Sequence, residues 1–403
     1  MIHFDIKKKR DSLFIVTSSF FLSLLWMEPS FSTRLCCQKL RQMDKLGPPL
    51  HPASPYKSDF FKHYICLQNQ ITRNMKIFPV FLCFLLFSTF FSPSLAEHCN
   101  PHDKKVLLQI KKALNNPYLL ASWDPKTDCC DWYCLECDLK THRVISLTMF
   151  SDDRLTGQIP AEVGDLPYLE TLLFRHLPNL NGTIQPSIAK LNNLKTLRLS
   201  WTNLSGSVPD FLSQLKNLTY LDLSFNNLSG SIPSSLSSLP NLAALHLDRN
   251  KFTGSIPESF GKFPGKAPDL FLSHNKLSGT IPASLGNMDF NAIDLSRNML
   301  EGDASMLFGS NKTTWEIDLS RNMFQFNLSK VEFPKSLARL DLNHNKIMGS
   351  IPAGLTGVDL QFMNVSYNRL CGQIPVGGRL QSFGYSTYFH NRCLCGAPLE
   401  SCK

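Results

Sequence analysis

The middle of the sequence contains no cysteine. There are 13 cysteines in 403 residues, yet none lies between Cys137 and Cys371. Disulfides cannot hold that stretch together, so it must bury an apolar core of its own. Residues 97–403 also lack an excess of charge of either sign. They carry 29 basic and 27 acidic side chains, whereas residues 1–74 carry 11 and 5. A nucleic-acid binder would need a strong basic stripe, and this near balance argues against one.

Familiar catalytic motifs are absent as well. The sequence has no G-x-S-x-G, no H-E-x-x-H and no phosphate-binding glycine-rich loop. Composition does not exclude a carboxylate pair for glycosidic hydrolysis, but the strand Asp residues are explained by the repeat described below. We therefore predict a protein that is not an enzyme and uses no cofactor and no metal.

Long hydrophobic runs are missing too. Two apolar stretches, residues 13–26 and 77–91, fall short of the roughly 20 residues that span a bilayer. The second follows Met75 and Lys76 and ends Ser94-Leu95-Ala96, which is the pattern of a secretory signal. We predict a signal peptide over residues 75–96, a secreted mature chain from Glu97, and a disordered upstream extension over residues 1–74. The alternative is that one of the two stretches is an uncleaved anchor.

Nine cysteines remain after residue 97, in two clusters near the ends. The C-x-x-C and C-x-C spacings invite a zinc interpretation, but secretion favours disulfides. Spacing does not fix the connectivity. The pairs we propose are Cys99–Cys129, Cys130–Cys137, Cys371–Cys393 and Cys395–Cys402, with Cys134 left over.

A repeat fills the region between the clusters. One unit opens LDLSFNNLSG at Leu221 and the next LHLDRNKFTG at Leu245. From Asn226 onward, the Asn recurs at spacings of 24, 25, 23, 24, 23 and 23 residues. Three looser units precede these, which gives ten units over residues 143–375. This is the leucine-rich-repeat pattern.

The repeat predicts an α/β right-handed solenoid with a parallel β-sheet on its concave side. In L-x-L both leucines point inward, and the Asn is buried at the turn, where it must bond backbone groups. Gly-x-Ile-Pro follows in most units. Solenoid ends need caps, which we assign to residues 97–142 and 376–403. In the first cap a helix is predicted from Val106, Leu107, Ile110, Ala113 and Leu114, with Asn100 as its N-cap.

The residues between the strand leucines face solvent on the concave sheet. Neighbouring strands lie ~4.8 Å apart, so Asp294, Asp318 and Asp341 are expected to form a row of like charges. Such a row is unfavourable and favours a partner-binding face. The alternative is that Arg297 and Arg321 neutralise it locally.

Exposed aromatic side chains in the same columns favour a protein partner over a small ligand. The predicted partner-binding residues are Arg198, Trp201, Asp222, Phe225, His246, Asp248, Phe271, Asp294, Asp318 and Asp341.

Glycosylation is also predicted, because N-x-S/T sequons are usable in a secreted chain. Asn364 lies on a concave strand position, where a glycan would crowd the binding face, so we expect it to stay unmodified. The candidate sites are Asn181, Asn203, Asn217, Asn227, Asn311, Asn327 and Asn364.

Together these features resemble the polygalacturonase-inhibiting proteins, a plant extracellular leucine-rich-repeat family. The resemblance covers residues 75–403 and is carried by TDCCDWYC at 127–134, SVPDFLSQLKNL at 207–218 and YFHNRCLCGAPL at 388–399. Residues 1–74 have no place in the family pattern.

The resemblance implies a cell-wall protein that binds fungal endo-polygalacturonases on its concave face and blocks pectin cleavage. It also implies weak pectin binding through basic side chains, for which the candidates here are Arg249, Arg297 and Arg321. The alternative function is a ligand-recognition or adhesion protein of the receptor-like type without inhibitor activity.

Overall fold

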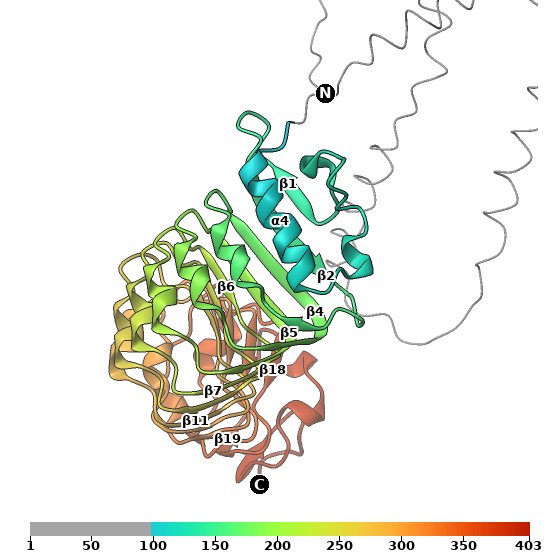
Figure 1. Cartoon of the computed structure of the whole chain (residues 1–403). Helices are drawn as coiled ribbons and strands as arrows, with labels where there is room; N and C mark the ends of the chain where they lie inside the picture. Colours follow the sequence, from blue (N-terminus) through green and yellow to red (C-terminus); the bar gives the residue numbers. More distant parts are fainter. Residues whose placement is uncertain (1–97) are drawn as a thin grey trace, which may run out of the picture. The chain divides into compact units, whose positions relative to one another are not determined.

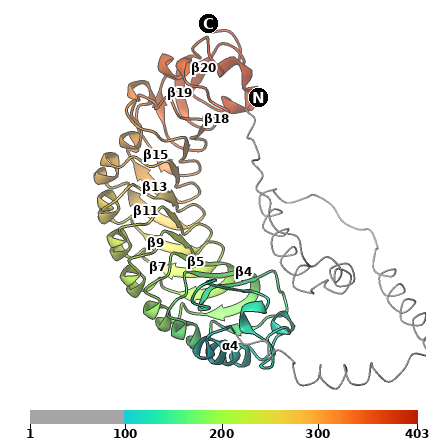
Figure 2. The ribbon, with the colours of Figure 1, turned by 90° about the horizontal axis from the view of Figure 1, so that it is seen from above.

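The structure, a computed structural model, describes residues 98–403. The predicted upstream extension and signal peptide lie outside the described residues. Residues 98–403 form a stack of coils that curves into an arc, with strands along its inner side and short 3₁₀ helices along its outer side (Figure 2). The predicted leucine-rich-repeat solenoid is confirmed.

One strand from each coil joins the concave sheet. Neighbouring strands pair in parallel and in register, so that Ile293 lies beside Ile317 and Ile317 beside Leu340. These side chains are at most 1% exposed and form part of one continuous core. The described concave strands are β2 (Val144–Phe150), β4 (Thr171–Gly182), β5 (Thr196–Gly206), β6 (Tyr220–Asp222), β8 (Ala244–His246), β10 (Asp269–Phe271), β12 (Ala292–Asp294), β14 (Glu316–Asp318), β16 (Arg339–Asp341) and β18 (Phe362–Asn364).

The recurring Asn residues tie the coils together. Asn250 Nδ2 donates to the carbonyl of Leu223 in the preceding coil at 2.9 Å and to Leu247 in its own coil at 3.2 Å. Its Oδ1 accepts from the amide of Leu228 at 3.0 Å. The amide thus satisfies buried backbone groups that no other coil element reaches, as the sequence predicts.

After each turn a second strand forms, and Gly-x-Ile-Pro leads to the outer side. Gly230 ends its strand at φ 83°, a left-handed conformation that favours glycine. Pro233 then occupies the N-cap position of the 3₁₀ helix η6 (Ser234–Ser238). The second strands are β3 (Gly157–Gln158), β7 (Asn227–Gly230), β9 (Lys251–Gly254), β11 (Lys276–Thr280), β13 (Met299–Gly302), β15 (Met323–Phe324), β17 (Met348–Gly349) and β19 (Arg369–Gln373).

The outer side of the arc is made of the 3₁₀ helices. They are η3 (Ala161–Asp165), η4 (Pro186–Lys190), η5 (Asp210–Gln214), η6, η7 (Glu258–Lys262), η8 (Ala283–Asn287), η9 (Ser305–Leu307), η10 (Leu328–Lys330) and η11 (Ala353–Gly357).

The N-terminal cap is built on helix α4 (Pro101–Ala113), beside β1 (Leu135–Cys137) and β2 (Figure 1). Asn100 is its N-cap, with its side chain accepting from the His102 amide at 3.0 Å. Val106, Leu107 and Ile110 are buried, whereas Ala113 is exposed, contrary to the predicted apolar face. Ala113 is the last residue of the helix, and the C-cap residue Leu114 is buried as predicted.

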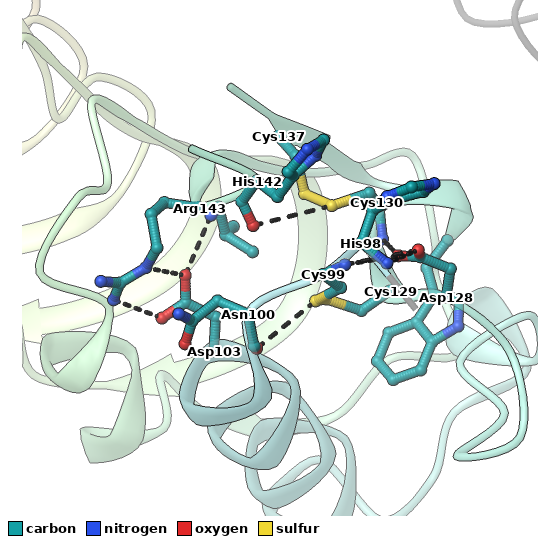
Figure 3. Close-up of a disulfide and its surroundings, with 12 residues drawn as sticks. His98, Cys99, Asn100, Asp103, Asp128, Cys129, Cys130, Cys137, His142 and Arg143 are labelled. Atoms are coloured by element: carbon teal, nitrogen blue, oxygen red, sulfur yellow. Dashed lines mark hydrogen bonds and ion pairs between the residues drawn. A yellow bond between two sulfur atoms is a disulfide. The ribbon is translucent and has the colours of Figure 1, made fainter. Parts of the chain in front are cut away.

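Two disulfides staple this cap internally, and an ion pair fastens it to the first coil (Figure 3). The buried Asp103 carboxylate accepts from Arg143 Nε at 2.8 Å and Nη2 at 2.7 Å. The disulfides join Cys99 to Cys129 and Cys130 to Cys137. Cys134 is buried and takes no part in a disulfide. These pairs are the ones proposed from the sequence.

The C-terminal cap imitates one more coil. Its strand β20 (Cys393–Cys395) pairs with β19, and disulfides join Cys371 to Cys393 and Cys395 to Cys402. Asn391 donates to the Val365 carbonyl at 3.0 Å and accepts from the Leu370 amide at 3.0 Å, as the repeat Asn residues do. Within residues 98–403, none of the helices has the length and apolar character needed to cross a membrane.

Candidate functional site on the concave sheet

The predicted acidic row exists. Asp294 lies in register with Asp318, and Asp318 with Asp341, at the ends of β12, β14 and β16. Asp294 and Asp318 are partly exposed, whereas Asp341 is only 7% exposed. Three carboxylates therefore stand on adjacent strands ~4.8 Å apart.

Each carboxylate of the row also has a structural partner. Asp294 Oδ1 and Asp318 Oδ1 accept from the amide two residues along the chain, both at 2.9 Å, and Asp341 does the same at 3.1 Å. Asn364 fills the same role in the next coil, accepting from the Ser366 amide at 3.1 Å. An acceptor oxygen is thus useful to the fold here, but a negative charge is not required.

Burial and mutual repulsion make the row hard to ionise fully. Burial, followed by the charges of Asp294 and Asp341, raises the pKa of Asp318 to about 7. Burial also raises the pKa of Asp341. On β14 itself, two residues before Asp318, burial raises the pKa of Glu316 in spite of its ion pair with Arg339 at 2.8 Å. A cationic partner would stabilise the charged forms of these groups.

Local neutralisation of the row is partial. Among the described residues, no ion pair joins Arg297 or Arg321 to the three carboxylates, although the charges of Arg339 and Arg321 act against the rise in the pKa of Asp341. Arg297 and Arg321 are exposed. They belong instead to a separate column at the edge of the sheet, where the chain turns away from the strand.

That column is formed by the residue just before the buried Asn, or its substitute, of each coil, and we call it the stacked column. Its residues have φ values near +55°, although none is glycine. The turn is enforced by backbone bonds between coils, such as Arg249 N to Ser273 O at 2.8 Å. The members from His176 onward are His176, Trp201, Phe225, Arg249, His274, Arg297, Arg321, His344, Tyr367 and His390.

Flat side chains stack along this column. The rings of Trp201 and Phe225 lie 3.6 Å apart, and the Arg249 guanidinium lies 4.8 Å from the Phe225 ring. At the other end, Tyr367 stacks between His344 at 4.1 Å and His390 at 4.4 Å. The sequence identified some of these residues as surface contacts, namely Trp201, Phe225, Arg249, Arg297 and Arg321. The left-handed backbone was not foreseen, because no Gly or Asn marks it.

The centre of the concave face differs from the acidic row. Arg198 Nε pairs with Asp222 Oδ2 at 2.7 Å, and Asp222 is 2% exposed. His246 stacks on Phe271 at 4.4 Å and lies 5.3 Å from the Tyr220 ring. Burial lowers the pKa of His246. The predicted residues Arg198, Asp222, His246 and Phe271 are thus brought together in one packed patch.

Asp248 stands beside this patch. Its carboxylate lies 4.0 Å from His246 Nδ1, and burial, followed by the charge of Asp222, raises its pKa to about 7.

The sequence analysis missed one column of concave-face residues, which lies two residues before the column of Asp222, Asp318 and Asp341. Tyr220, Glu316, Arg339 and Phe362 lie there, and Arg339 sits 4.2 Å from the Phe362 ring. Side chains alternate along a strand, so residues two apart share a face. The period of two would have identified this column.

The described residues bring together one cluster with metal-ligand chemistry, Cys99, Asp128, Cys129 and Cys130. It does not fit a metal, because its three sulfur atoms are in disulfides. Asp128 is occupied as well, accepting from the amides of His98 at 2.6 Å and Cys130 at 2.9 Å (Figure 3).

The sequons differ in exposure. Asn181, Asn203, Asn217, Asn311 and Asn327 are exposed, whereas Asn227 and Asn364 are partly buried. Asn364 Oδ1 accepts from the Ser366 hydroxyl at 2.7 Å as well as from its amide. A glycan at this position would have to leave from the concave sheet itself.

Comparison with known proteins identifies the repeat. A leucine rich repeat N-terminal domain model matches residues 100–138, and leucine rich repeat models match residues 192–252, 269–288 and 336–358. Among solved structures, a plant ice-binding protein is similar at 55% identity and a TM-score of 0.75, covering 76% of this chain and 99% of that one.

Curated relatives are more similar still. Polygalacturonase inhibitor 1 of Arabidopsis thaliana is 72% identical over 325 residues, 80% of this chain and 98% of that protein. The polygalacturonase inhibitor of Pyrus communis is 73% identical over 319 residues, 79% and 96% respectively. The chain therefore belongs to the polygalacturonase inhibitor family of leucine-rich-repeat proteins.

Proposed function

We propose that the mature chain, residues 97–403, is a secreted inhibitor that binds fungal endo-polygalacturonases on its concave face and blocks pectin degradation in the plant cell wall. The observation that carries the proposal is the 72% identity to a protein named polygalacturonase inhibitor, over 98% of its length. Domain boundaries, removal of residues 75–96 and glycosylation of the exposed sequons belong to the same proposal.

The chemistry of the concave face supports a basic protein partner. Asp294 and Asp318 are partly exposed and lack a basic side chain within ion-pair distance among the described residues. Lys or Arg side chains on the rim of a substrate cleft would offset the repulsion within the row. A partner with acidic groups there would be rejected, which gives selectivity.

Aromatic side chains on the same face supply apolar anchoring. Phe271, in register with Asp294, presents a half-buried ring. Trp201, on β5 at the edge of the sheet, is 41% exposed. Aromatic groups of this kind concentrate binding energy in protein interfaces. Arg249, Arg297 and Arg321 form the exposed basic part of the stacked column, and we propose them as the pectin contacts.

The alternative, a recognition protein without inhibitor activity, uses the same scaffold. The similarity to a plant ice-binding protein shows that coils of this build serve other purposes. Only surface residues distinguish these functions, so a direct assay is needed.

A reducing-end assay tests the proposal. The secreted protein would be titrated into a panel of fungal endo-polygalacturonases acting on polygalacturonate. Saturable loss of rate with at least one enzyme is the expected result. Full activity of every enzyme at micromolar protein would reject the inhibitor function and favour the recognition protein. The released sugar also reports any hydrolysis by the chain itself, which we expect to be nil.

A further inference from the structure

The stacked column stops one coil short at its N-terminal end. The His176 ring lies 4.8 Å from the Trp201 ring. In the preceding coil, Ser151 occupies the equivalent position. Ser151 has the same left-handed backbone, φ 56°, and its amide donates to Arg175 O at 3.0 Å. It therefore occupies a position of the column, but its side chain is too short and too polar to stack on a ring.

An open cleft of about 610 Å³ lies at this place, lined by Ser151, Asp153, His176, Pro178 and Trp201. After its column position, β4 contains residues that β5 lacks. The pairing of β4 with β5 shifts register between Leu177 and Asn181, and Pro178 and Asn179 are exposed there. Asn179 Nδ2 donates to the Asp153 carbonyl at 2.6 Å and fixes this wall.

The cleft carries negative charge toward solvent. Asp153 is exposed, and the ion pairs of the described residues do not include it, whereas its neighbour Asp152 is buried and lies 3.7 Å from Arg154. His176 lines the same cleft. A ligand group here would meet a flat ring and a free carboxylate together.

We propose that this cleft receives the guanidinium group of an arginine side chain from the protein partner, stacked over His176 and paired with Asp153. The guanidinium is planar and permanently charged, so it satisfies both features of the cleft. The column already accepts such a group, since the Arg249 guanidinium lies 4.8 Å from the Phe225 ring. The inference rests on the proposed function only for the identity of the partner, a polygalacturonase.

One variant fills the cleft from within. Ser151→Arg places a guanidinium at a left-handed position that Arg249, Arg297 and Arg321 already adopt at φ 53–56°, so it should fold. It is expected to weaken inhibition about tenfold, the loss of one good contact. Ser151→Ala leaves the cleft open and should inhibit as the wild type does. Equal inhibition by wild type and Ser151→Arg would overturn the inference while leaving the proposed function intact.

A second measurement does not depend on the enzyme. The ¹H–¹⁵N resonance of the Trp201 indole would be followed during titration with N-acetylarginine methylamide, with the neutral citrulline analogue as matched control. A shift in the millimolar range with the arginine compound alone, abolished in Asp153→Asn and in Ser151→Arg, is the expected result. No shift, an equal shift with citrulline, or a shift only with methyl galactoside would overturn the inference; the last would make the cleft a sugar site.

Discussion

The two halves of the concave face use the same backbone in different ways. In the first half, on β5 to β10, charges are matched within the protein: Arg198 pairs with the buried Asp222, and His246 packs between Tyr220 and Phe271. In the second half, on β12 to β16, three carboxylates accept hydrogen bonds but lack a basic partner among the described residues. Apart from Asp248, whose pKa is also raised to about 7, the first half is already satisfied, and the second gains most from a partner.

Neutralising the second half should have the largest effect on inhibition. The triple variant Asp294→Asn, Asp318→Asn, Asp341→Asn keeps the acceptor oxygen, as Asn364 does naturally. We expect inhibition to fall about a hundredfold, since three charge contacts of ~1 kcal/mol each are lost. Titration of the reducing-end assay measures this change.

The folded state provides the control. The triple variant should melt at or above the wild-type temperature, because repulsion within the row is removed. Substitution by Lys would also remove the acceptors and lower stability, so it is the poorer test. Asn at 294 and 318 creates N-x-S sequons, so the variant should be made in a bacterial periplasm, which forms disulfides. Undiminished inhibition by this variant would place the site elsewhere on the solenoid.

Breaking the matched pair of the first half should act on stability instead. Arg198→Ala leaves the Asp222 carboxylate buried without its cation, at a cost of about 2–3 kcal/mol. The melting temperature should fall by roughly 5 °C or more, with inhibition changed less than threefold. Asp222→Asn combined with Arg198→Ala should recover part of the loss. A variant that melts normally but no longer inhibits would show that Arg198 contacts the partner directly.

Removal of the exposed Trp201 ring tests whether the edge of the sheet contributes to binding. Trp201→Ala removes the ring that stacks on Phe225. We expect inhibition to weaken about tenfold, because an exposed aromatic anchor is lost. Stability should fall by about 1 kcal/mol. Trp315→Ala, at another ring with 41% exposure, is the matched control and should keep inhibition within twofold.

The smallest effect concerns pH. Asp318 has a pKa of about 7 in the folded protein, above the ~3.9 expected for an unfolded chain. The native state therefore holds a proton between about pH 4 and pH 7 that the unfolded chain releases, and its contribution to stability is lost as pH rises through this window.

Melting curves at pH 5 and pH 7 check this. Asp318→Asn should raise the melting temperature at pH 7 by about 2 °C, with little change at pH 5. Asp289→Asn, at a carboxylate outside the row, should not reproduce this difference. A rise of the same size at both pH values would show that repulsion by an ionised Asp318 is not its cause.

The scaffold was predictable from the sequence because its causes are local and repeated. Three features each predict the same stack of coils. They are the spacing of Asn226 and Asn250, the inward leucines and the terminal cysteine clusters. The register of Asp294 with Asp318 followed directly. The surface was less predictable. The stacked column depends on a left-handed turn enforced by bonds between coils, and the cleft at Ser151 lies beside the register shift at Pro178.

The central claim is that the partner docks on the second half of the concave sheet. Hydrogen–deuterium exchange of the protein alone and bound to an inhibited polygalacturonase tests it most directly. Bonds between coils already protect both halves when the protein is free. The account predicts added protection in the complex over residues 292–345, extending to the edge at Trp201, and none on the outer 3₁₀ helices. Added protection on the outer helices with an unchanged acidic row would contradict it.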